Sequence, residues 1–97
     1  MSNAIVVTMR LTPSDPNAFQ TFLTDILPDT RKARGCRSCT THTEKDNAGN
    51  FLLLQEWDSI EDQQAYMAWR DSTGVLKTFL GHLAKPAEVN IWQLNKA

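Results

Sequence analysis

The side chains of this chain that could do chemistry suggest a small aromatic pocket. Trp57, Tyr66 and Trp69 could form the walls of a dry cavity, and Tyr66 would add a phenol group that can hydrogen-bond. His42 could act as a base, because imidazole exchanges a proton near neutral pH. Arg70 could hold an anionic substrate or intermediate. His42 and Tyr66 are therefore the candidate catalytic residues, and the candidate substrate-binding residues are Trp57, Trp69 and Arg70.

Each of these side chains also has a purely structural interpretation. Trp57 could only seal the edge of the core. Tyr66 and Trp69 are three residues apart on a predicted helix and can pack together as part of a core stripe. Arg70 lies near the end of that helix, where a cation offsets the helix dipole, and His42 lies on a polar segment and could face solvent. An enclosed pocket that holds His42 or Tyr66 with a convergent partner would favour the chemical interpretation.

Trp57 lies at a predicted junction between a strand and a helix. The continuous apolar run from Phe51 to Leu54 is typical of a strand that is covered on both faces. Ser59 followed by Asp62 has the spacing of a capping box, which predicts a helix from about Ser59 to Arg70. The large aromatic side chain is thus placed where the mouth of a pocket could form.

The segments before this junction predict a strand and then a long helix. Ile5–Leu11 alternates in the manner of a strand. Asp15 followed by Pro16 is the arrangement of an N-cap and a first-turn proline. We expect Pro28 to kink or interrupt this helix, because proline lacks an amide hydrogen, and we expect the helix to end by Gly35. One apolar stripe at helical spacing contains Phe19, Phe22, Leu23, Ile26 and Leu27.

The rest of the chain completes a β-α-β-β-α-β order. Residues 37–45 predict a polar strand and residues 46–50 a hairpin turn. Residues 71–74 break the second helical segment, a short helix follows over 75–83, and residues 88–94 form the last strand. This order predicts an α+β, ferredoxin-like fold with a split second helix. The helices would cover one face of the sheet, and a second copy is the obvious cover for the other, which predicts a homodimer.

Bulk properties limit the partners. The 97 residues make a single domain, 1–97, and the formal net charge of -1 argues against nucleic acid as the main partner. No segment approaches the ~20 apolar residues that a membrane span needs. The first residues lack the pattern of an export signal, so we expect a cytoplasmic protein. Ser2-Asn3-Ala4 resembles the scar of an expression tag, and a native origin stays open.

Cys36 and Cys39 form a Cys-x-x-Cys pair. Residues three apart on a strand point to opposite faces, so we expect neither a disulfide nor a shared metal ion here. His42 and His82 do not complete a recognised zinc pattern, so no metal site is expected. Two free thiols suit a reducing cytoplasm.

Across essentially its whole length the chain resembles the antibiotic biosynthesis monooxygenase family of dimeric α+β barrels. The similarity rests on the turn at Gly35-Cys36, the junction Glu56-Trp57-Asp58-Ser59, Ala65-Tyr66, the short helix around 76–80 and a last strand after Pro86. It implies a homodimer whose sheets form a barrel, with a hydrophobic pocket between sheet and helices in each protomer. It further implies a cofactor-independent monooxygenase or quinol oxidase that acts on a small aromatic or polycyclic phenolic substrate and needs no cofactor.

Several positions depart from the family pattern. Many members carry a His where this chain has Tyr66, and the anthrone-oxidising members have an Asn at the position of Leu53, although their pocket Trp corresponds to Trp57. The positions used by the haem-degrading branch are filled by Met9, Tyr66 and about Leu80, so haem degradation is not expected. The alternatives to an oxygenase are a non-oxidative enzyme such as a small-metabolite isomerase and a non-catalytic dimeric small-molecule-binding or stress-response protein.

Overall fold

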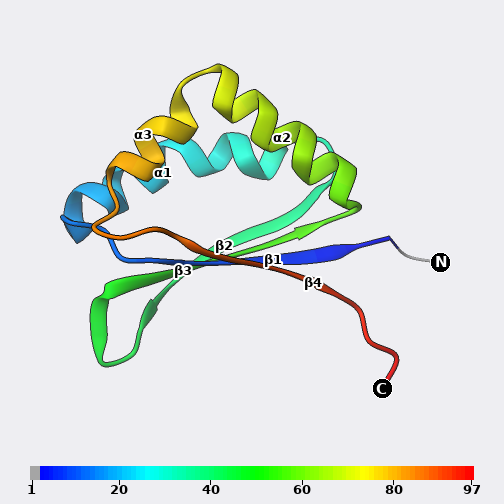
Figure 1. The fold of residues 1–97 in the computed structure, drawn as a ribbon, viewed down its shortest axis with the longest axis horizontal. Helices are drawn as coiled ribbons and strands as arrows, with labels where there is room; N and C mark the ends of the chain where they lie inside the picture. The colour runs from blue at the N-terminus through cyan, green and yellow to red at the C-terminus, as the bar shows by residue number, and fades with distance from the viewer. Residues whose placement is uncertain (1–2) are drawn as a thin grey trace.

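The computed structural model describes residues 3–97; Met1 and Ser2, and with them the start of the Ser2–Ala4 sequence, lie outside the described residues. A four-stranded antiparallel sheet has the order β2-β3-β1-β4, and all three helices lie on one of its faces (Figure 1). This arrangement confirms the predicted α+β, ferredoxin-like fold with a split second helix. The elements are β1 (Ile5–Leu11), α1 (Pro16–Lys32), β2 (Cys36–Glu44), β3 (Asn47–Trp57), α2 (Ile60–Ser72), α3 (Val75–Gly81) and β4 (Glu88–Gln93).

The core lies between the helices and the two central strands. Alternate residues of β1 and β3 point to the helices because successive side chains of a strand point to opposite faces. The register pairs Ile5 with Trp57, Val7 with Gln55 and Met9 with Leu53. α1 packs its own apolar stripe onto this face. The buried residues of the stripe are Phe19, Leu23, Leu27 and Thr30.

The long helix α1 starts as its sequence predicts and does not break where its sequence suggests. The Asp15 side chain accepts hydrogen bonds from the amides of Asn17 and Ala18, each at 3.1 Å. The predicted kink or interruption at Pro28 was wrong, because α1 continues through it to Lys32. The carbonyl of Thr24 loses its usual amide donor there. Thr24 and Pro28 are both exposed, so that carbonyl lies on the water-facing side of the helix.

The β2–β3 hairpin is longer than expected. Residues 46–50 were predicted as the turn, but the turn is Lys45 and Asp46, and β3 already begins at Asn47. Glu44 pairs with Asn47, and the Asn50 amide donates to the Glu44 carboxylate at 3.2 Å. A two-residue connection lets these polar residues extend the ladder, which turn-forming residue types alone do not reveal.

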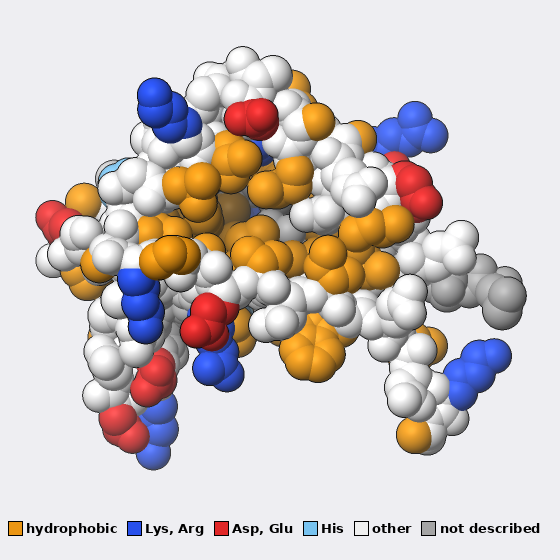
Figure 2. All heavy atoms as spheres, in the orientation of Figure 1, with side chains coloured by type: hydrophobic (Ala, Val, Ile, Leu, Met, Phe, Trp, Pro, Cys, Tyr) orange, Lys and Arg blue, Asp and Glu red, His pale blue; other side chains and the backbone are white. Residues whose placement is uncertain are grey.

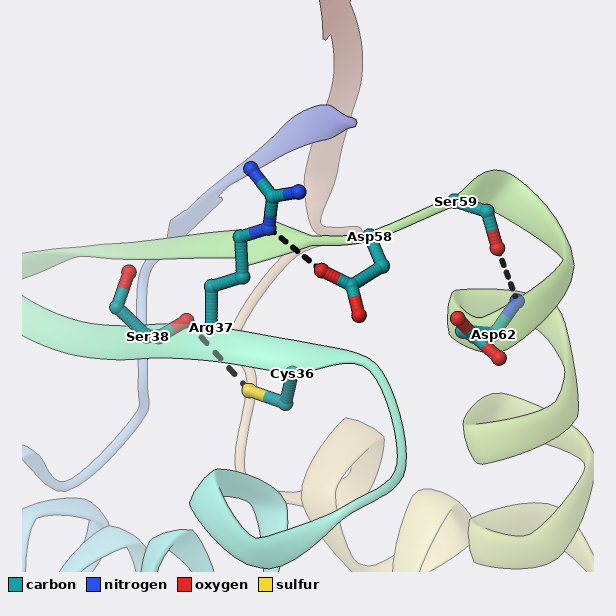
Figure 3. A network of polar contacts seen from close by, with 6 residues as sticks. All are labelled: Cys36, Arg37, Ser38, Asp58, Ser59 and Asp62. Atoms are coloured by element: carbon teal, nitrogen blue, oxygen red, sulfur yellow. Dashed lines mark hydrogen bonds and ion pairs between the residues drawn. The ribbon is translucent and has the colours of Figure 1, made fainter. Parts of the chain in front are cut away.

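The cysteines lie on the same face of β2, which corrects the expectation that they point to opposite faces. The pairing register shifts between Cys36 and Ser38, so that Cys36 lies opposite Trp57 and Cys39 opposite Gln55. Those two partners both face the helices, and so do both thiols. The extra residue at the bulge is Arg37, which forms an ion pair with Asp58 on the other side of the strand (Figure 3). Both cysteines are free thiols.

The junction between β3 and α2 is held from two sides. The Ser59 hydroxyl accepts from the amide of Asp62 at 3.2 Å, which confirms the predicted N-cap (Figure 3). The amide of Asp58 donates to the carbonyl of Gly35 at 2.8 Å. Gly35 has a φ of 84°, and a Cβ there would lie 2.3 Å from a carboxylate oxygen of Asp62. The turn after α1 therefore packs directly against the first turn of α2.

Among residues 3–97 no helix has the length and apolar character needed to cross a membrane.

Candidate functional site

A cavity of about 90 Å³ lies between the sheet and the helices α2 and α3. Its wall is mostly apolar, and the polar side chains in it are Gln55 from β3 and Tyr66 and Arg70 from α2. Figure 2 shows hydrophobic side chains gathered along β4 and under α2 and α3, around a hollow. Val89 of β4 and Leu80 of α3 are half-exposed at this mouth. The cavity is therefore a small apolar site with a few polar groups, the usual composition of a site for a small organic ligand.

The size of this cavity limits what it holds. An apolar cavity of about 150 Å³ accommodates benzene, and sites for drug-sized ligands measure about 300–1,000 Å³. At about 90 Å³, the present cavity is smaller than either, so it has room for only part of a single ring. A polycyclic phenol does not fit the cavity in this conformation.

Arg70 is the most unusual residue of the site, because it is a buried cation without a carboxylate partner. It is 5% exposed, and the only ion pair among residues 3–97 is that of Arg37 with Asp58. Its Nε donates to the Tyr66 hydroxyl at 2.8 Å, and its Nη2 donates to the carbonyl of Ile26 at 2.7 Å. Its Nη1 makes no hydrogen bond to any residue that the structure describes. A buried guanidinium with a free N–H end is a ready site for an anionic oxygen.

Tyr66 connects this arginine to α1. Its hydroxyl lies 2.5 Å from Oγ1 of Thr30, which also accepts from Nη2 of Arg70 at 3.2 Å. The three side chains thus form a closed polar triangle within an apolar environment, and each fixes the rotamers of the other two. Tyr66 is held with its oxygen toward the arginine.

Trp57 is completely buried, with an exposure of 0%. Its ring centroid lies 5.2 Å from that of Tyr66, and its indole N–H donates to the side-chain oxygen of Gln55 at 2.9 Å. Trp57 therefore supports two residues of the cavity wall from behind. Trp57 therefore has both a structural and a site-related role, because its ring fills the core and its contacts fix polar groups of the site.

Trp69 lies outside the cavity. It is 47% exposed and lines an open surface groove of about 490 Å³ between the end of α1 and α2, which Tyr66 also lines. The guanidinium carbon of Arg70 lies 4.7 Å from the ring centroid of Trp69 and 5.3 Å from that of Tyr66. Trp69 thus covers the buried arginine from the outside.

The structure does not bring His42 and Tyr66 together within this chain. His42 lies opposite Leu52 in the ladder, and Leu52 alternates with core residues, so both point away from the helices. His42 Nε2 lies 2.9 Å from Oγ1 of Thr40 on the same face. His42 lines a different surface hollow of about 440 Å³ near the hairpin. The sheet separates it from the cavity that holds Arg70.

The thiols near the site are poor nucleophiles. Burial, reinforced by the neighbouring Cys36, raises the pKa of Cys39 from its ordinary value of 9.0 to about 11, although Arg31 and a hydrogen bond from Gln55 oppose the rise. Burial also raises the pKa of Cys36. Both groups therefore stay protonated near neutral pH, where a thiolate would be needed for covalent or redox chemistry. No group of three or more His, Cys, Asp or Glu side chains among the described residues is arranged to hold a metal ion.

Two residues of the site were not among the sequence candidates. Gln55 follows the apolar run of β3, and strand alternation places it on the same face as Leu53 and Trp57, so a polar residue on an apolar face was the available signal. Thr30 occupies a buried position on the stripe of α1, seven residues after Leu23. Both lie where an apolar residue would be the ordinary choice.

A family model for the antibiotic biosynthesis monooxygenases matches residues 4–79, from β1 through most of α3. A conserved protein from Methanosarcina mazei Go1 has a similar structure, with 20% identity, a TM-score of 0.86, and coverage of 97% of this chain and 95% of that chain. SnoaB, a cofactor-independent oxygenase from Streptomyces nogalater, has 16% identity and a TM-score of 0.82, with coverage of 99% and 97%. Rv0793 from Mycobacterium tuberculosis has 23% identity and a TM-score of 0.78, with coverage of 97% of each chain. No curated protein sequence matches the chain.

Proposed function

The chain belongs to the antibiotic biosynthesis monooxygenase family, and on that premise we propose that it is a cofactor-independent oxygenase or quinol oxidase acting on a small phenol or hydroquinone. The observation that carries this proposal is the buried Arg70, which lines a mostly apolar cavity and whose Nη1 makes no hydrogen bond to a described residue. The oxygenase name of SnoaB supports the reaction class. The volume of the cavity favours a single-ring substrate over a polycyclic one.

The proposed reaction needs few functional groups from the protein. The substrate loses a proton from its phenol and the phenolate donates electrons directly to oxygen. In a quinol oxidation, the hydroquinone gives two electrons and two protons to O₂, and the products are a quinone and H₂O₂. In a monooxygenation, a ring CH₂ group activated by the phenol becomes a carbonyl, one oxygen atom enters the product, and the other leaves as water. Both reactions become easier when the phenolate is stabilised before it meets oxygen.

Arg70 supplies that stabilisation. Its Nη1 donates to the phenolate, while Nε and Nη2 stay bonded to Tyr66 and α1 and keep the guanidinium in place. A preorganised charged donor in a site that excludes water is worth far more than the same donor in solution. The described lining residues include no carboxylate, His or Lys, so the substrate proton leaves through the mouth to solvent. The rate should therefore follow the ionisation of the substrate.

Oxygen consumption tests the proposal. The panel is hydroquinone, methylhydroquinone and anthrone, and the variants are Arg70→Met and Tyr66→Phe, with Arg34→Met as the matched control. Arg34 is an exposed arginine and makes no described hydrogen bond, so its loss should leave the rate unchanged. We expect uptake with the single-ring quinols, lost in Arg70→Met and reduced in Tyr66→Phe. Binding of these phenols without any oxygen uptake would instead favour the isomerase or the non-catalytic binding protein.

The other face of the sheet supports a homodimer as part of this proposal. This face has no helix over it, and Trp92 of β4 is 55% exposed there while its indole N–H donates to Thr8 at 2.9 Å. Val6, Leu52 and Leu54 add apolar side chains to the same face. A second copy would remove this surface from water. Light scattering at micromolar concentration should give about twice the 11.0 kDa mass of the chain, and a monomeric mass would overturn the dimer.

A further inference from the structure

Gln55 is a second polar group of the cavity wall, and the proposed function has not used it. It is 2% exposed, lies on the central strand β3, and faces the helices between Val7 of β1 and Cys39 of β2. A primary amide at such a position needs partners for both its oxygen and its nitrogen, because burying an unpaired polar group is costly. Where these partners lie decides what the amide offers to a ligand.

Trp57 fixes the orientation of this amide. The indole N–H is a donor only, so the atom that receives it at 2.9 Å must be the carbonyl oxygen of Gln55. The amide nitrogen therefore occupies the opposite branch, away from Trp57. Both residues are fully or almost fully buried, so no water competes for this bond. The hydrogen bond from Trp57 therefore sets which branch of the Gln55 amide carries the oxygen and which carries the nitrogen.

The amide nitrogen of Gln55 has only a weak protein partner. The thiol of Cys39, which lies opposite Gln55 in the ladder, is the one partner indicated for it among the described residues, and sulfur is a poor acceptor. Arg70, the other polar group with free N–H capacity in the wall, is also a donor, and the Tyr66 oxygen is already engaged by Arg70 and Thr30. Among the described residues, the wall therefore offers hydrogen-bond donors and no free acceptor.

We propose that Gln55 is a ligand-binding residue that donates its amide N–H to an anionic or carbonyl oxygen, and that Trp57 is the positioning residue that aims it. This inference rests on the proposed function and sharpens its substrate class. The preferred ligand is a small apolar ring whose oxygen accepts hydrogen bonds, that is, a phenolate or a quinone rather than a neutral phenol. Arg70 contributes charge, and Gln55 contributes a second, neutral donor from the other side of the cavity.

The test compares two probes of nearly equal shape on the intact chain. 4-Nitrophenol binds as a phenolate with a distinct visible absorption, whereas 4-nitrotoluene carries a methyl group in place of the oxygen. Gln55→Leu removes the donor and keeps the volume, and Gln55→Met serves the same purpose if the first variant does not fold. Gln63→Leu is the matched control, because Gln63 is also a buried glutamine but lies outside the cavity wall.

We expect Gln55→Leu to weaken binding of the phenolate about 10- to 100-fold, as a lost hydrogen bond to a charged group does, while binding of 4-nitrotoluene stays nearly constant. Trp57→Phe, which leaves Gln55 in place but frees its amide, should reduce the preference for the phenolate by less. Gln63→Leu should leave the preference of the wild type unchanged.

Equal weakening of both probes, or no weakening of either, would overturn the inference, and so would a wild type that binds neither probe. Oxygen uptake by the wild type is measured separately with hydroquinone. If the wild type consumes oxygen but does not prefer the phenolate to 4-nitrotoluene, the role of Gln55 is refuted and the proposed function stands. If it prefers the phenolate but consumes no oxygen, the role of Gln55 stands and the proposed function is refuted.

Discussion

Replacing Arg70 by methionine should separate the function of the cavity from the stability of the fold. Methionine keeps the length and most of the apolar stem of the side chain but removes the charge and all its donors. In the structure, Arg70 is bonded to the Tyr66 hydroxyl, the Thr30 hydroxyl and the carbonyl of Ile26. A conservative view would predict a severely destabilised protein, because each bond from a charged group contributes about 1.5–3 kcal/mol.

Two features of the site reduce that loss. Tyr66 and Thr30 lie 2.5 Å apart and can keep that bond without the arginine, and Ile26 lies inside α1, where its carbonyl has a helical donor. No partner atom is therefore left buried and unpaired. In addition, removing an uncompensated buried charge relieves a desolvation penalty of several kcal/mol. We expect a net destabilisation of only about 1–2 kcal/mol, which for a domain of this size lowers the midpoint of thermal unfolding by about 5–15 °C.

The catalytic loss should be much larger. Removing one preorganised donor to a developing oxyanion lowers kcat by about 10²- to 10³-fold, and we expect a loss of this size in oxygen uptake. Arg70→Lys should not rescue the activity, because an ammonium cannot form the planar fork that reaches both α1 and the ligand. Thermal melts and oxygen-electrode rates on the same preparations give both quantities. A loss of stability above about 4 kcal/mol would contradict this account of the arginine, and an Arg70→Met variant with full activity would refute its role.

Three further predictions follow from local geometry. Gly35→Ala should destabilise more than Gly74→Ala in urea melts, because both sites have a positive φ but only the first would place a Cβ 2.3 Å from Asp62; equal losses would argue against this close packing. Burial raises the pKa of Cys39 to about 11 in the folded protein, while the thiol of the unfolded chain titrates near 9.0. Between these two values the unfolded chain releases the proton first, so the free energy of unfolding should fall by about 2–3 kcal/mol as the pH rises from 9.0 to about 11. Cys39→Ala should show a shallower fall over that window, and an unchanged slope would refute the assignment. His42→Gln should lower kcat/KM far less than loss of the cavity arginine does; a comparable loss would mean that the histidine reaches the ligand after all.

Local rules were sufficient to predict most of the fold. The N-caps Asp15 and Ser59 are decided by their own side chains and the next three residues, and both were confirmed. Strand alternation correctly predicted the strand Ile5–Leu11, in which every second residue from Ile5 is buried. Pro28 was misread because the cost of a proline depends on whether the freed carbonyl can reach water, and that is a property of the packed helix.

The error about the two cysteines has a physical origin, because side-chain direction along a strand depends on its pairing. The bulge at Arg37 changes the phase of β2, so Cys36 and Cys39 point the same way although their spacing predicts the opposite. No local signal in the sequence marks that bulge, which is accompanied by contacts between residues far apart in the chain, the ion pair of Arg37 with Asp58 and the hydrogen bond from the Asp58 amide to the Gly35 carbonyl.

Trp57 affects the candidate site in a different way from the one that its sequence position predicted. Its type and place suggested the wall of a pocket, yet the ring is wholly enclosed and lies behind the wall. A tryptophan in this position still affects the ligand, because its N–H is a donor that needs an acceptor, and the nearest acceptor on the same strand face is the oxygen of Gln55. Satisfying that one bond turns the amide nitrogen into a fixed donor. The polar character of the cavity therefore follows from a core residue, and a search restricted to exposed aromatic side chains would not find it.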